Sequence, residues 1–346
     1  MKPIRIPSIY CPFPAQISPY VEAVHEHSLA WTTRFHLIQK PVALRRFLAS
    51  RFAWLTTRAY HSAGLEELKL MNDWLVWLFL FDDQFDDSQL GEQPKYLQAL
   101  LNDYSAIITN PRAAFTPSPA AEAIADLCQR SFSHMSTSWR ERYTQHFITY
   151  LDTYNWTVNN RMQGSVPSLD AYIEMRRHSG GLTMAIDLID LAVGLPEYLS
   201  KNPEFELLHD TTNDAVCWSN DIISLQKELA RGDVNNLVIV IQHAYGLQLQ
   251  EAVDRVNEMI TARVQLFERT VRNLPTFAPE LETTVQKHLN ILKGWMRGNL
   301  DWSAETYRYS HIESTLSGES VGYLEDILAI PPDSLKSTAQ GLGNPY

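Results

Sequence analysis

The sequence predicts an all-α protein folded as a single domain, and three observations support this. Apolar residues recur at helix-compatible spacing along the chain of 346 residues. No stretch of useful length shows the alternation of a strand, and there is no internal repeat or interior linker. Short connections containing Pro or Gly separate the periodic segments, which is typical of a helical bundle.

The elements follow one another in a clear order. Residues 1–17 carry four prolines, which favours an extended N-terminal strap. Residues 331–346 are rich in Pro, Ser and Gly and are expected to form a mobile tail, so that the domain spans residues 1–330. Helices are expected at about 18–37 and 41–60, then from after Gly64 through the aspartate stretch 82–87, in two shorter segments between 90 and 136, and at 139–162, 168–178, 182–193, 205–231, 237–245, 248–273 and 279–307.

Composition excludes several classes of protein. The chain has 29 Lys and Arg against 40 Asp and Glu, a formal charge of −11, which argues against a nucleic-acid partner. Three widely spaced cysteines without a CxxC motif predict free thiols and a reducing compartment. No signal peptide and no apolar run of about 20 residues is present, so we expect a cytoplasmic protein without a membrane span.

A group of aspartates dominates the third expected helix. The apolar run from Trp74 to Phe81 is typical of a buried helix, and four carboxylates then follow at positions 82, 83, 86 and 87. Asp82 and Asp86 are four apart, so on a helix they lie on one face, one turn apart. Carboxylates paired in this way suit Mg²⁺, which takes its remaining ligands from water and substrate phosphates. A solvated acidic helix end is the alternative.

A second polar cluster lies in the expected helix 205–231. Asn220, Ser224 and Glu228 recur every four residues and form one stripe about 12 Å long. Their amide, hydroxyl and carboxylate oxygens can hold further Mg²⁺. A solvated stripe is the alternative, but Trp218 and Ile222 beside it indicate a buried helix whose polar groups need a partner.

The two stretches FDDQFDD and NDIISLQKE together resemble the paired metal motifs of microbial class I terpene synthases. Arg58-Ala59-Tyr60, the RGDVNNLV segment that begins at Arg231, and Trp302 with Arg308-Tyr309 extend the likeness over nearly the whole chain. The resemblance implies a single-domain bundle around a central apolar cavity. It also implies a lyase that ionises a prenyl diphosphate and uses three Mg²⁺, for which Mn²⁺ can substitute. Possible assembly as a homodimer stays open.

The resemblance also assigns roles to residues. Asp82, Asp86, Asn220, Ser224 and Glu228 resemble the metal ligands, and Asp83 the aspartate that pairs with a diphosphate-sensing arginine. We expect Arg177 to be that sensor and Gly181 to be the helix break that helps trigger ionisation. Because Arg176 is adjacent to Arg177, the choice of sensor between the two arginines stays open. Thr157 stands where many members of the family have a glutamate near the metal site. The remaining phosphate donors implied are Lys227, Arg308 and Tyr309.

An allylic cation needs an apolar wall with aromatic faces, each of which attracts it by about 0.5–2 kcal/mol. The rings that we expect to line such a cavity are Trp74, Trp77, Phe79, Phe81, Tyr154, Trp218 and Trp302. Plain core packing is the alternative for each of them. Their bulk suggests a modest cavity, which favours farnesyl diphosphate and a sesquiterpene product over geranylgeranyl diphosphate and a diterpene.

Three other functions are weighed against this one. A chain-elongating prenyltransferase would carry a second aspartate-rich motif in place of the Asn/Ser/Glu stripe. A cyclase that protonates its substrate would carry DxDD, which the stretch from Gln84 to Asp87 lacks. A non-catalytic isoprenoid-binding protein would not need both metal motifs.

Overall fold

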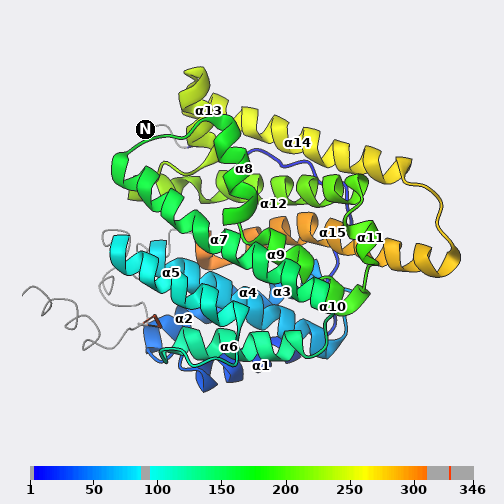
Figure 1. The fold of residues 1–346 in the computed structure, drawn as a ribbon. Helices are drawn as coiled ribbons and strands as arrows, with labels where there is room; N and C mark the ends of the chain where they lie inside the picture. Colours follow the sequence, from blue (N-terminus) through cyan, green and yellow to red (C-terminus); the bar gives the residue numbers. More distant parts are fainter. Residues whose placement is uncertain (1–3, 87–93, 310–326, 329–346) are drawn as a thin grey trace, which may run out of the picture.

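The computed structural model describes residues 4–86, 94–309 and 327–328, without the side chains of Asp86 and Pro94. Every regular element in these ranges is a helix, as the sequence predicts (Figure 1). None of these helices has the length and apolar character needed to cross a membrane. The helices are α1 (Val21–Arg34), α2 (Pro41–Ser50), α3 (Phe52–Ala59), α4 (Leu65–Asp86), α5 (Pro94–Thr109), α6 (Pro119–Phe132), α7 (Thr137–Gln163), α8 (Leu169–Ser179), α9 (Leu182–Asp187), α10 (Asp190–Val193), α11 (Glu197–Ser200), α12 (Pro203–Arg231), α13 (Leu237–Tyr245), α14 (Leu249–Asn273), α15 (Pro279–Glu305) and the 3-10 helix η2 (Tyr307–Tyr309).

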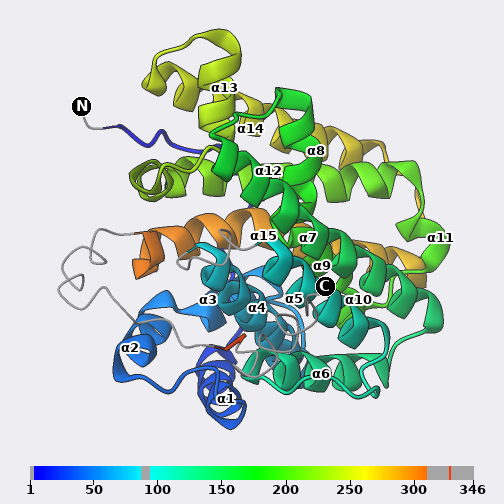
Figure 2. The ribbon, with the colours of Figure 1, turned by 60° about the vertical axis from the view of Figure 1, so that its left-hand side comes forward.

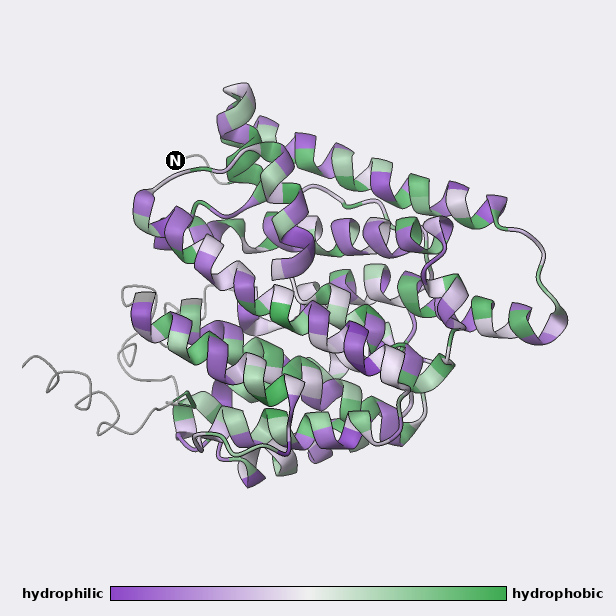
Figure 3. Cartoon of the chain, viewed as in Figure 1, coloured by the Kyte–Doolittle hydropathy of each residue, from purple (hydrophilic) through white to green (hydrophobic). Residues whose placement is uncertain are grey.

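The helices form one packed body. In two views, α13 and α14 lie on one side and α1, α2 and α6 on the opposite side (Figures 1 and 2). Between them, α12 packs on α14 and α15, α15 packs on α3, and α4 packs on α1, α3 and α6. Apolar residues gather on the faces that helices turn toward one another, while hydrophilic residues lie outward (Figure 3). This arrangement agrees with the single domain predicted.

Local sequence explains where many of the helices begin and end. The side chains of Ser118, Ser136 and Ser168 accept hydrogen bonds from backbone N–H groups at the starts of α6, α7 and α8. α7 and α12 end at Gly164 and Gly232, which have φ of 58° and 71°. The polar caps and glycines are therefore reliable boundary signals in this chain.

The expected helix 41–60 is wrong as a single element, because it breaks between α2 and α3. Arg51 has φ of 53°, a left-handed conformation that interrupts the helical hydrogen bonds. The break leaves the carbonyl of Ser50 to accept from Trp302 Nε1 at 2.8 Å and from Thr306 Oγ1 at 3.0 Å. Contacts with the distant C-terminal part of the bundle thus compensate for the lost helical bonds. The expected helix 182–193 is likewise two short pieces, α9 and α10.

The N-terminal strap is non-helical as expected over its described part, residues 4–17. The backbone of Arg5 exchanges hydrogen bonds with the Gln250 side chain of α14, at 2.9 and 3.1 Å. Phe13 makes an edge contact with Phe267, also on α14, at 5.7 Å between ring centroids. The predicted tail, residues 331–346, lies outside the described residues.

Candidate active site

A deep pocket opens between α4, α7, α8, α12, α15 and η2, and its α4 wall is one helical stripe. Leu75, Leu78, Phe79, Asp82 and Phe85 line it, at spacings of three, one, three and three residues. This spacing keeps all five side chains on one side of the helix. Asp82 therefore stands at the end of an apolar wall, as the sequence predicts.

Three of the rings predicted on this helix do not line the pocket. Trp74, Trp77 and Phe81 lie on a neighbouring stripe, about 100° around the helix, and are fully buried in the core. Trp74 Nε1 donates to Ser131 Oγ at 2.9 Å, and Trp77 Nε1 donates to the carbonyl of Ala120 at the same distance. The expectation that they form the cavity wall is wrong, because the two tryptophans join α4 to α6 and Phe81 packs on rings of α5 and α7.

Trp218 is a fourth incorrect prediction. It is buried at 3% exposure, away from the pocket, and the Arg263 guanidinium of α14 lies 5.6 Å from the centre of its ring. It lies two positions before Asn220, which places it about 200° around the helix from the polar stripe. The predicted cavity rings that do line the pocket are Phe79, Tyr154 and Trp302, and the lining rings that were not predicted are Phe85, Tyr150, Trp156, Tyr172 and Trp295.

The two adjacent aspartates of α4 have different partners. Asp82 Oδ1 accepts a hydrogen bond from the Tyr154 hydroxyl at 3.1 Å, and Tyr154 OH lies 2.5 Å from Tyr150 OH. Asp83 is held by Arg308, whose Nη1 and Nη2 donate to its two oxygens at 2.9 and 2.7 Å. Burial raises the pKa of Asp83, but the charge and hydrogen bonds of Arg308 outweigh this and hold it below the ordinary value. The side chain of Asp86 lies outside the described structure.

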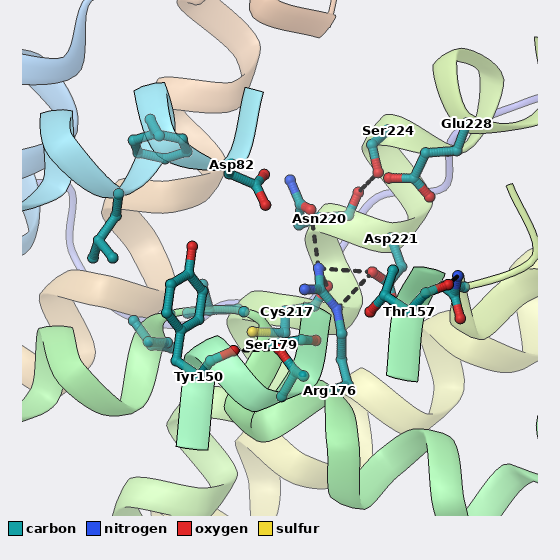
Figure 4. Close-up of a pocket in the computed structure, with 18 of the residues that line it drawn as sticks. Asp82, Tyr150, Thr157, Arg176, Ser179, Cys217, Asn220, Asp221, Ser224 and Glu228 are labelled. Atoms are coloured by element: carbon teal, nitrogen blue, oxygen red, sulfur yellow. Dashed lines mark hydrogen bonds and ion pairs between the residues drawn. The ribbon is translucent and has the colours of Figure 1, made fainter. Parts of the chain in front are cut away.

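The α12 stripe faces Asp82 across the pocket (Figure 4). Asn220 Nδ2 donates to Tyr309 OH at 2.8 Å, and Ser224 Oγ donates to the carbonyl of Asn220 at 2.7 Å. Glu228 accepts from Asn236 Nδ2 at 2.7 Å. Burial raises the pKa of Glu228 to about 7, and the charge of nearby Asp221 adds to the effect. The three residues of the predicted triad therefore lie together on one wall of the pocket.

The two adjacent arginines of α8 point in different directions, and Arg176 is the one that lines the pocket. Its Nε donates to Asp221 Oδ1 at 3.0 Å, and its Nη2 donates to Asn220 Oδ1 at 3.1 Å (Figure 4). Asp221 is 1% exposed and also accepts from the hydroxyl of Tyr172 at 2.7 Å. Asp221 and Tyr172, which the sequence reading did not single out, therefore fix the guanidinium next to the triad.

Arg177 does not line the pocket, so our expectation that it faces the mouth is wrong. Its Nε and Nη2 each donate to Asp214 at 2.8 Å, and its Nη1 pairs with Asp210 at 2.9 Å. Arg263 of α14 binds the same Asp214, which is fully buried. Neighbouring residues on a helix point about 100° apart. The partners Asp214 and Asp221, two turns apart on α12, decide which arginine points inward.

The predicted helix break is present between α8 and α9. Gly181 has φ of 69°, a conformation that suits glycine, and it lines the pocket with Ser179 and Gly180. Asn213 Nδ2 donates to the carbonyl of Arg177 at 2.8 Å and so anchors the chain just before the break. Residues of this turn therefore border the pocket, as Arg176 does.

The remaining predicted phosphate donors also reach the pocket. Lys227 lines it from α12, and Arg308 and Tyr309 line it from η2. Arg308 lies over the ring of Phe79 at 4.9 Å from its centre, and Tyr309 makes an edge contact with Trp302 at 5.8 Å. Thr157 lines the pocket from α7, where it supplies a hydroxyl and no carboxylate.

The donor set fits a hard divalent cation. Within the described residues, no three His, Cys, Asp or Glu side chains gather as a metal cluster. The candidate ligands are instead one carboxylate on α4 and an amide, a hydroxyl and a carboxylate on α12, all of them oxygen donors. Mg²⁺ prefers such ligands and binds through few protein side chains when a substrate phosphate supplies the rest.

Comparisons with known proteins agree with this geometry. The family described as "Terpene synthase family 2, C-terminal metal binding" matches residues 73–265. A germacrene A synthase from Nostoc punctiforme is 34% identical, over 90% of this chain and 98% of its own. The chain belongs to the terpene synthase family. The resemblance drawn from its two motifs is thereby confirmed, and the match includes both of them.

Other relatives of this terpene synthase support the assignment. A (+)-T-muurolol synthase from Roseiflexus castenholzii, described as cyclizing (2E,6E)-farnesyl diphosphate, is 32% identical over 86% of this chain and 92% of its own. Among solved structures, a cucumene synthase variant has a TM-score of 0.77 and 26% identity, covering 87% of this chain and 99% of that one. Hedycaryol synthase shares the fold, with a TM-score of 0.76 at 23% identity and the same coverage.

Proposed function

We propose that this terpene synthase ionises farnesyl diphosphate in a Mg²⁺-dependent reaction and cyclises the carbocation to a sesquiterpene. The observation that carries the proposal is the pairing of two walls across one apolar pocket. Asp82 comes from α4, and Asn220, Ser224 and Glu228 come from α12. Three cationic side chains, Arg176, Lys227 and Arg308, line the same mouth, where a diphosphate would be bound.

Different residues of the chain bind the metal ions and the diphosphate during ionisation. Asp82, Asp86, Asn220, Ser224 and Glu228 would hold the metal ions, which neutralise the charge of the leaving diphosphate. Arg176 and Arg308 are each oriented by a carboxylate, and a guanidinium can donate to phosphate through a planar fork. We therefore assign to Arg176 the role of diphosphate sensor first expected of Arg177.

The second half of the reaction depends on the apolar part of the pocket. Phe79, Tyr154 and Trp302 present aromatic faces or edges below the charged mouth. They stabilise a desolvated carbocation through their π systems, and the closed wall keeps bulk water from capturing it early. The ring of Trp302 is fixed by its Nε1, which donates to the carbonyl of Ser50.

The choice of farnesyl diphosphate rests on the relatives. Bulky rings do not limit the cavity as expected, because Trp74, Trp77, Phe81 and Trp218 lie outside the pocket. Relatives that cover most of the chain, among them the T-muurolol synthase, are described as cyclizing farnesyl diphosphate. Geranylgeranyl diphosphate, leading to a diterpene, is the second candidate that the assay below includes.

A direct assay tests the proposal. The purified protein is incubated with geranyl, farnesyl or geranylgeranyl diphosphate and Mg²⁺, and diphosphate release and volatile products are measured. We expect release and cyclic hydrocarbons or alcohols with the farnesyl substrate, loss of activity in EDTA, and partial rescue by Mn²⁺. Full turnover in chelator would refute metal dependence, and turnover restricted to geranylgeranyl diphosphate would refute the substrate assignment.

A further inference from the structure

One polar side chain in the apolar wall of the pocket has no structural partner. Asn299 of α15 lines the pocket and is 5% exposed. Its Nδ2 forms no hydrogen bond with any described residue. A primary amide offers two donors and one acceptor, so its burial in an apolar wall is unfavourable unless something binds to it.

The packing of α15 explains why this amide points into the pocket. Gly294 and Gly298 lie so close to Arg58 and Ala59 of α3 that a Cβ at either glycine would collide with one of them. This contact fixes the rotation of the helix, and Trp295, Asn299 and Trp302 form the stripe that lines the pocket. Asn299 lies about 4.5 Å along the axis from Trp302, on the side away from η2. The amide is therefore placed among rings, below the charged mouth.

Several other polar groups of the pocket wall form hydrogen bonds with neighbouring residues. The amide of Asn220 binds both Arg176 and Tyr309. Arg161 Nη2 donates to Asp233 at 2.7 Å. Trp295, one turn from Asn299 on the same stripe, makes an edge contact with the ring of Tyr60 at 5.4 Å between ring centres. The Nδ2 of Asn299 remains without a partner among the described residues.

The unpartnered amide of Asn299 fits a small polar ligand. The pocket encloses about 230 Å³, well above the roughly 10–15 Å³ that one water molecule requires. A buried water needs two to four polar partners, and the Asn299 amide can supply a donor and an acceptor. The amide carries no charge, so an ion is not favoured at this position.

We propose that Asn299 binds a water molecule that captures the final carbocation, so that the product is a terpene alcohol. The inference rests on the proposed function, since the cation comes from ionisation of the prenyl diphosphate. A lone pair of the water forms the new C–O bond to the cationic carbon. The resulting oxonium then loses one proton to the released diphosphate, a base that the reaction itself supplies. No oxidant or further reactant is needed.

Family membership does not decide whether the product is an alcohol or a hydrocarbon. Relatives that match most of this chain include synthases named for hydrocarbons, germacrene A and eremophilene, and synthases named for alcohols, T-muurolol and pristinol. The proposal therefore depends on Asn299 itself.

The test uses the full chain with farnesyl diphosphate and Mg²⁺ in water enriched in heavy oxygen. Diphosphate release is measured beside the gas chromatography and mass spectrometry of the products. Asn299→Leu replaces the amide by an apolar group of similar size, and Asn290→Leu, at an exposed position of the same helix, is the matched control. Asn299→Ala keeps room for water but removes the donors, and serves also if the leucine variant does not fold.

We expect the unmodified enzyme and Asn290→Leu to give an alcohol that carries the heavy oxygen. Both Asn299 variants should lose the alcohol at least about tenfold in favour of hydrocarbons, with diphosphate release close to that of the unmodified enzyme. Hydrocarbons alone from the unmodified enzyme, or an undiminished labelled alcohol from the variants, would overturn the inference. Absence of diphosphate release from the unmodified enzyme would instead overturn the proposed function.

Discussion

Arg308 holds Asp83 through both of its terminal nitrogens, at 2.9 and 2.7 Å, although 225 residues separate the two in sequence. Both side chains are largely buried, at 10% and 17% exposure. The pair joins η2 to the end of α4 and so closes one side of the pocket mouth. A buried pair of this kind leaves an uncompensated charge when one partner is removed.

Replacing Arg308 by Lys keeps the charge but removes the fork that spans both oxygens of Asp83. We expect kcat/KM for diphosphate release to fall at least about tenfold, which corresponds to about 1.4 kcal/mol of barrier. Asp83→Asn should also impair the enzyme, because it leaves the buried guanidinium unpaired. Unchanged kinetics in Arg308→Lys would show that the fork has no part in ionisation.

The neighbouring arginines of α8 provide a matched pair of variants. Arg176→Lys should lower diphosphate release at least about tenfold, since the planar contact with Asp221 and Asn220 is lost. Arg177→Lys should retain most of the activity and instead lower the free energy of unfolding by about 1.5–3 kcal/mol, because Arg177 binds the buried Asp214. Steady-state kinetics and urea unfolding of both variants measure the two effects. The opposite ranking of activities would return the sensor role to Arg177.

Removal of a candidate metal ligand should separate activity from folding. Asp82→Ala and Glu228→Ala should abolish turnover with little loss of thermal stability, and Glu228→Asp should lose part of the activity because its carboxylate is shorter. Asp152→Ala, at an exposed position of α7, is the control carboxylate. Turnover like that of the unmodified enzyme in a folded Asp82→Ala protein would remove the aspartate motif from the mechanism.

Replacing either of two phenylalanines of α4 by alanine should have different effects on stability and products. Phe81 is fully buried in the core, so Phe81→Ala should cost about 3–5 kcal/mol of stability. Phe79 lines the pocket against Trp302, so Phe79→Ala should cost less stability and change the proportions of the products. Chemical unfolding and product analysis of the two proteins provide the comparison. A larger change in products from Phe81→Ala would contradict the assigned stripes.

Two histidines away from the pocket should make stability depend on pH. His209 Nε2 lies 2.8 Å from His288 Nε2, and burial lowers the pKa of His209 to about 3 and of His288 to about 4. The unfolded chain takes up these protons near the ordinary pKa of 6.5, so it binds more protons than the folded protein below that pH. The free energy of unfolding should therefore fall as the pH drops from about 6.5 toward 4, by up to about 1.4 kcal/mol per unit for each histidine.

Urea unfolding at pH values across this range measures the slope. His288→Gln should flatten it, whereas His243→Gln, at an exposed position, should leave it unchanged. An equally steep slope in His288→Gln would assign the acid sensitivity to other groups.

The sequence by itself determined the helical class, most helix boundaries and the identity of the two metal motifs. These features depend on local patterns: apolar periodicity, serine caps, glycine ends, and polar residues repeated every four positions on one helix. Asp82, Asn220, Ser224 and Glu228 could be placed on the pocket wall because each motif carries its own spacing.

Only the tertiary structure decided which side chains of a helix face the pocket. Arg176 points inward because Asp221 binds it, while Asp214 and Asp210 bind Arg177 on another side of α8. Phe79 lines the pocket and Phe81 does not, since Phe81 lies on the stripe of α4 that packs on α5 and α7. Periodicity shows which residues share a face, but the rotation of each helix depends on contacts between residues far apart in the chain. Other long-range contacts, between α15 and α3, turn Asn299 toward the pocket. The bonds of Trp302 and Thr306 to the carbonyl of Ser50 hold the break at Arg51.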